Sequence, residues 1–311
     1  MFVRLLAAVL PAAMQILPVT IPLGKPPKHA EPPRAPIEIA GPSWAEACKD
    51  SKDPDSWTRP APPVRIHANT YLVGTCGISS IFIVGTAGDI LIDGGPEAAA
   101  DMIANNIRTL GYDPRDVRII LNSHEHPDHA GGIARLQQLT GAQVYASAAQ
   151  AKVLSTGSAN TADPQAGTLQ PLPPARVDHI VADGEMVRLG NLALFPAMTP
   201  GHTAGAVTWH WGACDGGVCR QIVYADSLTP VSRDGYRFSN HPTVVDDFRK
   251  SIAKVAALAC DILLTPHPAA SAMPERLGLQ KPLNDANACR DYAAALTKRL
   301  DDRLAKEASA K

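Results

Sequence analysis

The sequence lacks an excess of charge of either sign. Its 311 residues include 29 lysines and arginines against 30 aspartates and glutamates, for a formal net charge of −1. A protein that binds along the phosphates of a nucleic acid normally shows a clear basic excess. We therefore expect no nucleic-acid partner, while an apolar fraction of 45% is enough to form a folded core.

A hydrophobic run long enough to cross a membrane is missing from the N-terminal region. Apolar residues 5–19 follow Arg4 and are interrupted by Pro11 and Gln15. This run is too short and too broken to span a membrane, but a positive charge followed by an apolar run of this length is typical of a signal peptide. We predict a signal peptide over residues 1–20, with an alternative end as late as residue 30 and an uncleaved membrane anchor as the other alternative. After processing we expect a monomer with no stable membrane association.

Proline divides the chain into a leader and a domain. Residues 21–63 contain many prolines and predict an extended leader segment, and the folded domain is expected over residues 64–311. Within that domain, segments such as residues 117–121 and 262–265 predict strands, and segments such as residues 98–110 and 243–259 predict helices. The alternation of strands and helices favours a layered α/β fold. Residues 154–172 have no period, as is typical of a long functional or mobile loop.

Cysteine pairs of the Cys-x-x-Cys type, typical of redox sites and zinc ribbons, are also missing. The even number of six cysteines instead favours three structural disulfides in an exported protein, and no catalytic thiol. Six cysteines can be paired in many ways. Loop closure favours two particular disulfides, and the two remaining cysteines form the third by elimination. The predicted pairs are Cys214–Cys219, Cys260–Cys289 and Cys48–Cys76.

The densest group of metal-ligating side chains is His124-x-His126-x-Asp128-His129, at the end of the predicted strand 117–121. Residues two apart in an extended chain point the same way, so His124 and His126 can bind one cation together. Pro127 favours an extended His126 and a turn that brings Asp128 and His129 to a second position nearby. The HExxH motif of other zinc enzymes is excluded, because Asp128 stands where its second histidine would be.

Two later histidines each follow a predicted strand. His202 lies in a Thr-Pro-Gly-His-Thr segment, and His267 follows Thr-Pro. Strand ends are where α/β folds gather functional groups. A set of five histidines and one aspartate without cysteine is typical of a catalytic rather than a structural zinc site. The predicted ligands are His124, His126, Asp128, His129, His202 and His267; the alternative is an adventitious histidine-rich turn.

Together with the upstream Leu91-Ile92-Asp93-Gly94-Gly95, these motifs resemble the metallo-β-lactamase fold superfamily over about residues 65–300. Further segments and the six-cysteine layout are similar to subclass B3 of that family; the segments are residues 77–80, 225–229, 236–239 and 266–268. The resemblance implies an αββα sandwich with two Zn²⁺ ions between its sheets. It assigns the first ion to His124, His126 and His202 and the second to Asp128, His129 and His267.

The same resemblance implies a periplasmic enzyme that confers antibiotic resistance. Its substrates would be β-lactam antibiotics, namely penicillins, cephalosporins and carbapenems, and a hydroxide bridging the metals would open the ring. Asp128 would also orient this nucleophile. Ser227 and Thr229 would bind the substrate carboxylate directly or through water, with simple turn chemistry as the alternative. Gln165 would contact substrate, and Asp93 would orient the ligand loop or merely cap a turn.

Two other functions remain open from the sequence. In glyoxalase II-like and lactonase-like relatives an aspartate on the corresponding strand end bridges both metals, and Asp226 has that place here. Ser227 directly after it and the absence of a basic tail for glutathione favour the β-lactamase. The other possibility is a metal-binding scaffold that has kept the fold and lost activity.

Overall fold

The structure, a computed structural model, describes residues 43–49 and 54–309. The predicted signal peptide and most of the leader lie outside the described residues. The part of the leader that is described is not simply extended, because it contains helix α1 (Trp44–Ala47) and the 3₁₀ turn η1 (Pro54–Trp57). Tertiary contacts explain the difference: Trp44 is buried, and Cys48 is joined to Cys76 of the domain.

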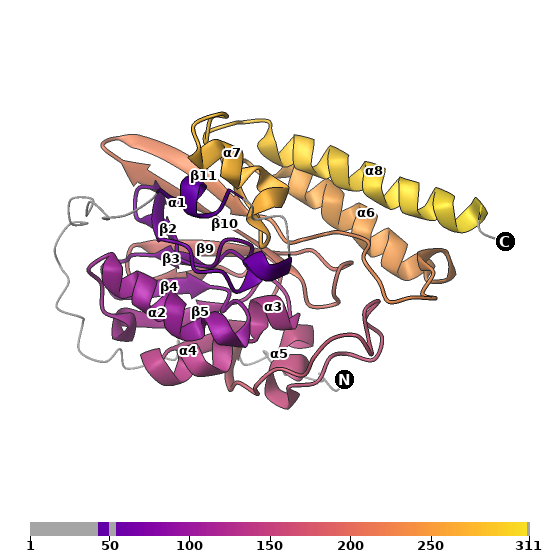
Figure 1. Cartoon of the computed structure of the whole chain (residues 1–311), viewed down its shortest axis with the longest axis horizontal. Helices are drawn as coiled ribbons and strands as arrows, with labels where there is room; N and C mark the ends of the chain where they lie inside the picture. The colour runs from indigo at the N-terminus through magenta and orange to yellow at the C-terminus, as the bar shows by residue number, and fades with distance from the viewer. Residues whose placement is uncertain (1–42, 50–53, 310–311) are drawn as a thin grey trace, which may run out of the picture.

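Two β-sheets packed against each other form the centre of the molecule (Figure 1). The seven-stranded sheet has its strands in chain order: β1 (Val64–His67), β2 (Thr70–Leu72), β3 (Ile81–Ile83), β4 (Asp89–Ile92), β5 (Val117–Leu121), β6 (Gln143–Ala146) and β7 (Val177–Ile180). The five-stranded sheet has the order β12 (Ile262–Leu264), β11 (Val218–Tyr224), β10 (Val207–Asp215), β9 (Leu192–Met198) and β8 (Val187–Leu189).

Helices cover the outer face of each sheet (Figure 1). The seven-stranded sheet is covered by α2 (Ala100–Thr109), α4 (Ile133–Thr140) and α5 (Ala148–Thr156). The five-stranded sheet is covered by α6 (Pro242–Ala257) and α8 (Ala288–Ser309), while the short α7 (Met273–Leu277) lies beside α1. These layers confirm the expected αββα sandwich. Within the described ranges, no helix has the length and apolar character needed to span a bilayer.

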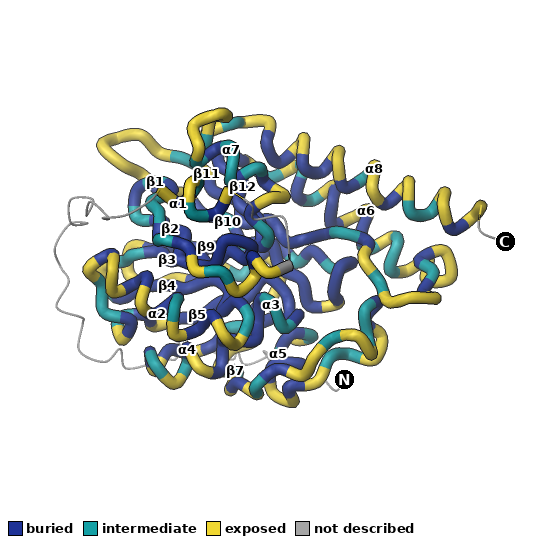
Figure 2. The backbone as a smooth tube through the Cα atoms, in the orientation of Figure 1, coloured by how far each residue is buried: buried dark blue, intermediate teal, exposed yellow. Residues whose placement is uncertain are grey.

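The strand sequences explain why the sandwich has four layers. In β3, the side chains of Ile81 and Ile83 pack between the two sheets. The side chain of Phe82 points to the opposite face and packs against the helices. In β12, Ile262 and Leu264 face the other sheet while Leu263 faces α6 and α8. Side chains alternate faces along a strand, so a strand that is apolar at every position needs cover on both sides. Figure 2 shows these strands buried and the outer helix faces exposed.

Strand direction brings the functional loops to one edge of the sandwich. β4 runs parallel to β5, and β11 runs parallel to β12. β9 and β11 are both antiparallel to β10 and therefore share a direction. The loops that follow these strands carry the predicted site residues.

All six cysteines form disulfides, in the three predicted pairs. The bonds are Cys48–Cys76, Cys214–Cys219 and Cys260–Cys289. The second closes the β10–β11 hairpin, and the third joins the segment before β12 to α8.

Candidate metal centre

The turn after β5 presents the first ligand candidates. The chain stays extended through His126, with φ −72° and ψ 151°, as the following proline favours. Pro127 then starts the short helix α3 (Pro127–Ala130), where its missing N–H costs nothing. This helix turns Asp128 and His129 toward the same side as the histidines before them.

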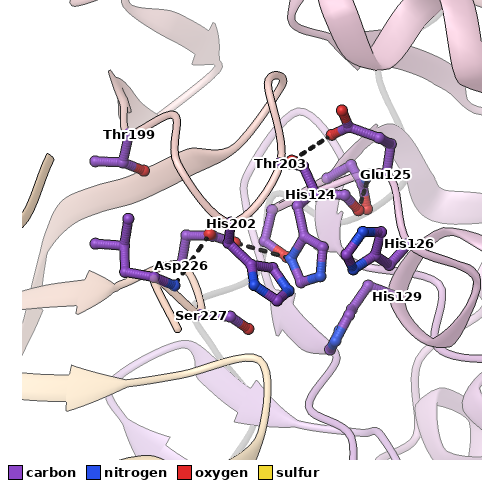
Figure 3. Close-up of polar contacts among 12 residues, drawn as sticks. His124, Glu125, His126, His129, Thr199, His202, Thr203, Asp226 and Ser227 are labelled. Carbon is purple, nitrogen blue, oxygen red and sulfur yellow. Dashed lines mark hydrogen bonds and ion pairs between the residues drawn. The ribbon is translucent and has the colours of Figure 1, made fainter. Parts of the chain in front are cut away.

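Three buried imidazoles form the first group. His124 and His126 come from the β5 turn, and His202 comes from the loop after β9. One ring nitrogen of each lies within 4.8 Å of those of the other two, and the ring centroids are 4.8–5.0 Å apart. Figure 3 shows these rings gathered around one space, with His129 at its side. The structure therefore brings His202 next to the turn, although the two are far apart in the sequence.

Each ring of this group is held in place through its other nitrogen. Nδ1 of His124 is hydrogen-bonded to Oδ1 of the buried Asp226 at 2.8 Å. Nδ1 of His202 donates to the carbonyl oxygen of Thr229 at 2.9 Å. Both rings consequently turn Nε2 toward the centre of the group, which is the arrangement in which a ligand histidine donates its remaining N–H to an outer partner.

The third ring is held by a residue that the sequence analysis missed. Nε2 of His126 lies 3.0 Å from Oδ2 of Asp163, and both side chains are buried. Asp163 also accepts, through Oδ1, the backbone N–H of Gln165 at 2.7 Å. Gln165 is thus placed in a loop that is attached to a ligand candidate. No periodicity or motif marked Asp163, because it lies in the aperiodic segment.

A second group forms beside the first. Nε2 of His129 lies 3.0 Å from Oδ2 of Asp128, and Nε2 of His267, from the loop after β12, lies 3.5 Å from the same oxygen. The two imidazole nitrogens are 3.3 Å apart. His124 also lies within metal-binding distance of Asp128 and His129. All six predicted ligands are therefore brought together in two adjoining sets.

Burial keeps three of the imidazoles neutral. It lowers the pKa of His124 well below its ordinary value, the pKa of His202 to about 3 and that of His267 to about 4. Burial works against charge on Asp128, but the neighbouring His129 holds the pKa of that carboxyl well below its usual range. Neutral imidazoles and ionised carboxylates are the forms that bind metals, so these three imidazoles and the Asp128 carboxylate are in the ligating state at neutral pH. At His129 burial acts in the same direction, but the charge of Asp128 outweighs it and raises the pKa of that imidazole.

The hydrogen-bond inventory fits a bound cation. Nε2 of His124 is buried and has no hydrogen-bond partner among the described residues. Leaving such a nitrogen unsatisfied costs about 1–3 kcal/mol, and a metal ion at the centre of the first group would satisfy it. A donor set of imidazole nitrogens with one carboxylate is one that zinc accepts, and it contains no thiolate of a structural site. The residues therefore fit a metal centre of the zinc type.

Asp93 supports the ligand turn from β4. It is fully buried, and its carboxylate accepts the N–H of Ser123 at 2.6 Å, the hydroxyl of Ser123 at 2.7 Å and the hydroxyl of Tyr224 at 2.6 Å. Burial raises the pKa of Asp93 to about 6. Because Ser123 directly precedes His124, these contacts place Asp93 where it can orient the ligand turn.

Glu125 connects the two loops of the first group. It is buried, and burial raises the pKa of its carboxyl. Oε2 accepts the hydroxyl of Thr203 at 2.7 Å (Figure 3). Oε1 accepts the backbone N–H of Gly205 at 3.1 Å. In the sequence, Glu125 stands out only as part of the excluded HExxH motif. The alternation of side chains along an extended segment was the available signal, since it points Glu125 away from His124 and His126.

The two predicted carboxylate-binding residues lie in the loop after β11. Ser227 is buried, and its hydroxyl has no hydrogen-bond partner among the described residues. Thr229 is partly buried, and its hydroxyl oxygen lies 3.4 Å from Nδ1 of His202. The structure thus places Thr229 against the first group and Ser227 directly after Asp226.

Known proteins resemble this chain in sequence and in structure. Residues 73–216 match the family described as the metallo-beta-lactamase superfamily. The metallo-β-lactamase MIM-1 from Novosphingobium pentaromativorans is similar in structure, with 48% identity, a TM-score of 0.84, and coverage of 86% of this chain and 98% of that one. MEM-A1, a subclass B3 metallo-β-lactamase from a soil metagenome library, has 45% identity, a TM-score of 0.79, and coverage of 82% and 100%.

A more distant likeness connects the chain with another activity. It is 31% identical to a hydroxyacylglutathione hydrolase of Cereibacter sphaeroides over 145 residues, which are 47% of this chain and 46% of the relative. The chain therefore matches about half the length of that relative.

Proposed function

Because this chain belongs to the subclass B3 metallo-β-lactamases, we propose that it hydrolyses the β-lactam ring of antibiotics with two zinc ions at the metal centre. The observation that carries the proposal is the convergence of six side chains from three separate loops into two adjoining sets. The substrates would be penicillins, cephalosporins and carbapenems, and the physiological result would be resistance to them.

Each set of side chains would hold one ion. His124, His126 and His202 would bind the first, and the second would be bound by Asp128, His129 and His267. Zinc bound in such a site supplies a nucleophile from water at neutral pH and draws electron density from a carbonyl oxygen. No serine or cysteine nucleophile is then needed.

Asp128 is the side chain proposed to act on the reacting atoms. Its Oδ2 faces His129 and His267, which leaves Oδ1 to accept a hydrogen bond from the attacking water and to orient it. Its depressed pKa keeps the carboxylate ionised at neutral pH, so that it is an acceptor throughout the working range. Asp226, Asp163 and the carbonyl group of Thr229 hold the rings of the first set, so these ligands need little reorganisation when substrate arrives.

The substrate carboxylate would be recognised by hydroxyl groups beside the first set. Thr229 lies against His202, and Ser227 is two residues away on the same loop. The buried hydroxyl of Ser227 has no hydrogen-bond partner among the described residues, which leaves it available to a ligand oxygen or a bridging water. Gln165 would contact the substrate from the opposite loop, which Asp163 anchors at His126.

The proposed compartment is the periplasm. Three disulfides are typical of a protein that folds in an oxidising environment. The predicted signal peptide agrees with export, and a periplasmic enzyme would meet the drug before it reaches its target.

The second candidate function is hydrolysis of a thioester or lactone, with Asp226 as a bridging ligand. The likeness to hydroxyacylglutathione hydrolases favours it. Asp226, however, is hydrogen-bonded through Oδ1 to Nδ1 of His124, and it belongs to neither set of converging ligand atoms among the described residues. The contact with His124 supports an orienting role for Asp226 and therefore the β-lactamase.

A panel of three substrates tests the assignment. The zinc-loaded protein would be assayed with a carbapenem, an acyl-homoserine lactone and a glutathione thioester under the same conditions. We expect clear turnover of the carbapenem. Turnover of only the lactone or the thioester would overturn the proposal in favour of the second candidate.

A further inference from the structure

One buried carboxyl group lies between the two loops that carry the first set of ligands. His124 and His126 lie in the turn after β5, and His202 lies in the loop between β9 and β10. Glu125, between the first two, is 4% exposed and belongs to neither set of converging ligand atoms among the described residues. Burying such a group is costly unless it is hydrogen-bonded, so its partners indicate what it does.

Both carboxylate oxygens of Glu125 accept hydrogen bonds from the loop of His202. Oε2 accepts the hydroxyl of Thr203, the residue directly after His202, at 2.7 Å (Figure 3). Oε1 accepts the backbone N–H of Gly205 at 3.1 Å. Hydrogen bonds to a carboxylate are stronger than those between neutral groups, and no water competes for buried ones. The loop of His202 is therefore fixed to the ligand turn at two points.

The contact at Gly205 is so close that a side chain would not fit there. A Cβ atom at this position would lie 2.6 Å from Oε2 of Glu125 and 2.7 Å from the backbone nitrogen of Gln150. Real Cβ atoms essentially never have neighbours this close. The glycine thus allows the backbone to come within hydrogen-bond distance of Glu125.

Helix α5 holds the same two loops together from the other side. Ser147, the N-cap of this helix, donates its hydroxyl to the carbonyl oxygen of Gly205 at 2.8 Å. Nε2 of Gln150 donates to the carbonyl oxygen of Ser123 at 3.0 Å, and Ser123 directly precedes His124. The surroundings of Glu125 are consequently held in place by the sandwich itself.

We propose that Glu125 is a positioning residue of the metal centre, which holds His202 against His124 and His126 so that the first set is formed before an ion binds. This inference rests on the zinc centre of the proposed function, and not on the identity of the substrate. Ligands that are already in place lose less conformational freedom when the ion binds, and the affinity is higher for that reason. The second set should not depend on Glu125, because none of its members lies in the loop of His202.

Zinc titrations of the full chain, followed by NMR of the histidine rings, test the proposal. The ring signals of His202 report on the first set and those of His267 on the second, so the two affinities are measured separately. Glu125→Met keeps nearly the same length and removes both acceptors. It should weaken zinc binding at His202 by about 10–100-fold and leave binding at His267 unchanged.

A conservative variant provides the rescue. Glu125→Gln keeps an acceptor for Gly205 and has an amide group that can donate to the hydroxyl oxygen of Thr203. Its zinc affinity at His202 should therefore be near that of the unaltered chain. Equal losses in the methionine and glutamine variants would overturn the proposal, and so would an equal loss at His202 and His267.

Thr203 provides a second test that does not depend on the folding of Glu125→Met. Thr203→Val removes the donated hydroxyl at nearly constant volume and should weaken zinc binding at His202 by about tenfold. The matched control is Thr140→Val, which removes a buried hydroxyl at the end of α4 that lies farther from the ligand turn. Equal zinc affinities in these two variants would overturn this inference alone. Absence of zinc binding by the unaltered chain would overturn the proposed function as well.

Discussion

Oδ2 of Asp163 lies 3.0 Å from Nε2 of His126, and both groups are buried. The long loop between α5 and β7 is therefore attached to a proposed zinc ligand. Arg233 secures the same loop from the other side, because its N–H donates to the carbonyl oxygen of Pro164 at 3.0 Å. One loop thus orients a metal ligand and also carries Gln165, the residue proposed to contact substrate.

Replacing Asp163 by asparagine should lower the affinity of the first set of ligands for its zinc ion. The neutral amide cannot stabilise the His126 ring as the carboxylate does, and loss of such an outer partner typically costs about 10–100-fold in metal affinity. Competition with a chromophoric chelator measures this change. Asp234→Asn, at an exposed aspartate in the neighbouring loop, is the matched control and should leave the affinity unchanged. Equal affinities in the two variants would show that Asp163 does not position His126.

Replacing Asp226 by asparagine separates the two candidate functions. If Asp226 only orients His124, the variant should bind zinc about 10–100-fold more weakly but still reach two ions per chain at saturating zinc. If Asp226 bridges the ions, as in the second candidate, the variant should fail to hold the full complement. Metal analysis across a zinc titration distinguishes these outcomes, and the second would contradict the assignment made here.

Replacing Asp128 by asparagine should affect both metal binding and turnover. Asp128 contributes the only carboxylate of the second set, and its other oxygen is proposed to orient the attacking water. We expect the second zinc ion to bind more weakly and kcat to fall by about 100-fold or more. Zinc stoichiometry and steady-state kinetics at saturating zinc would measure the two effects separately. A variant with full kcat would show that Asp128 neither binds metal nor orients water.

Asp89 gives the fold a defined pH dependence. Its folded pKa of about 7 lies above the ordinary value of 3.8, so the folded state binds this proton more tightly than the unfolded chain does. The contribution of the protonated carboxyl to stability is therefore lost as the pH rises from about 4 through 7. The asparagine of Asp89→Asn does not titrate. The free energy of unfolding of this variant should therefore rise relative to that of the unaltered protein across this pH window, by about 4 kcal/mol at most.

Chemical denaturation of both proteins at several pH values would measure the difference in unfolding free energy. Histidines and other carboxyls that titrate in the same window are common to both proteins and cancel in the difference. A difference that does not change with pH would contradict the raised pKa of Asp89.

The sequence predicted those parts of the site that depend on local geometry. His124 and His126 share one side of an extended segment, and Pro127 enforces the turn that follows. His202 and His267 were found because each directly follows an apolar strand, and strands of one direction place their ends at one edge. The division of the ligands between two ions, by contrast, came from the family resemblance and not from spacing.

The residues that the sequence did not reveal act through tertiary contacts. Asp163 meets His126 across 37 residues, and no repeat or motif in its loop marks the contact. α1 has only four residues, so its intrinsic helix propensity is weak, and the burial of Trp44 and the Cys48–Cys76 bond hold it. Strand β7 was missed because it lies at the edge of its sheet and is largely exposed, without an apolar alternation.

The most direct measurement is the hydrolysis of a carbapenem by the same preparation before chelation, after removal of its metal, and after zinc is restored, with zinc counted at each stage. We predict turnover with about two zinc ions per chain, a loss of turnover when both are removed, and recovery as they return. Unchanged turnover by the metal-free protein, or no turnover with two ions bound, would contradict the account.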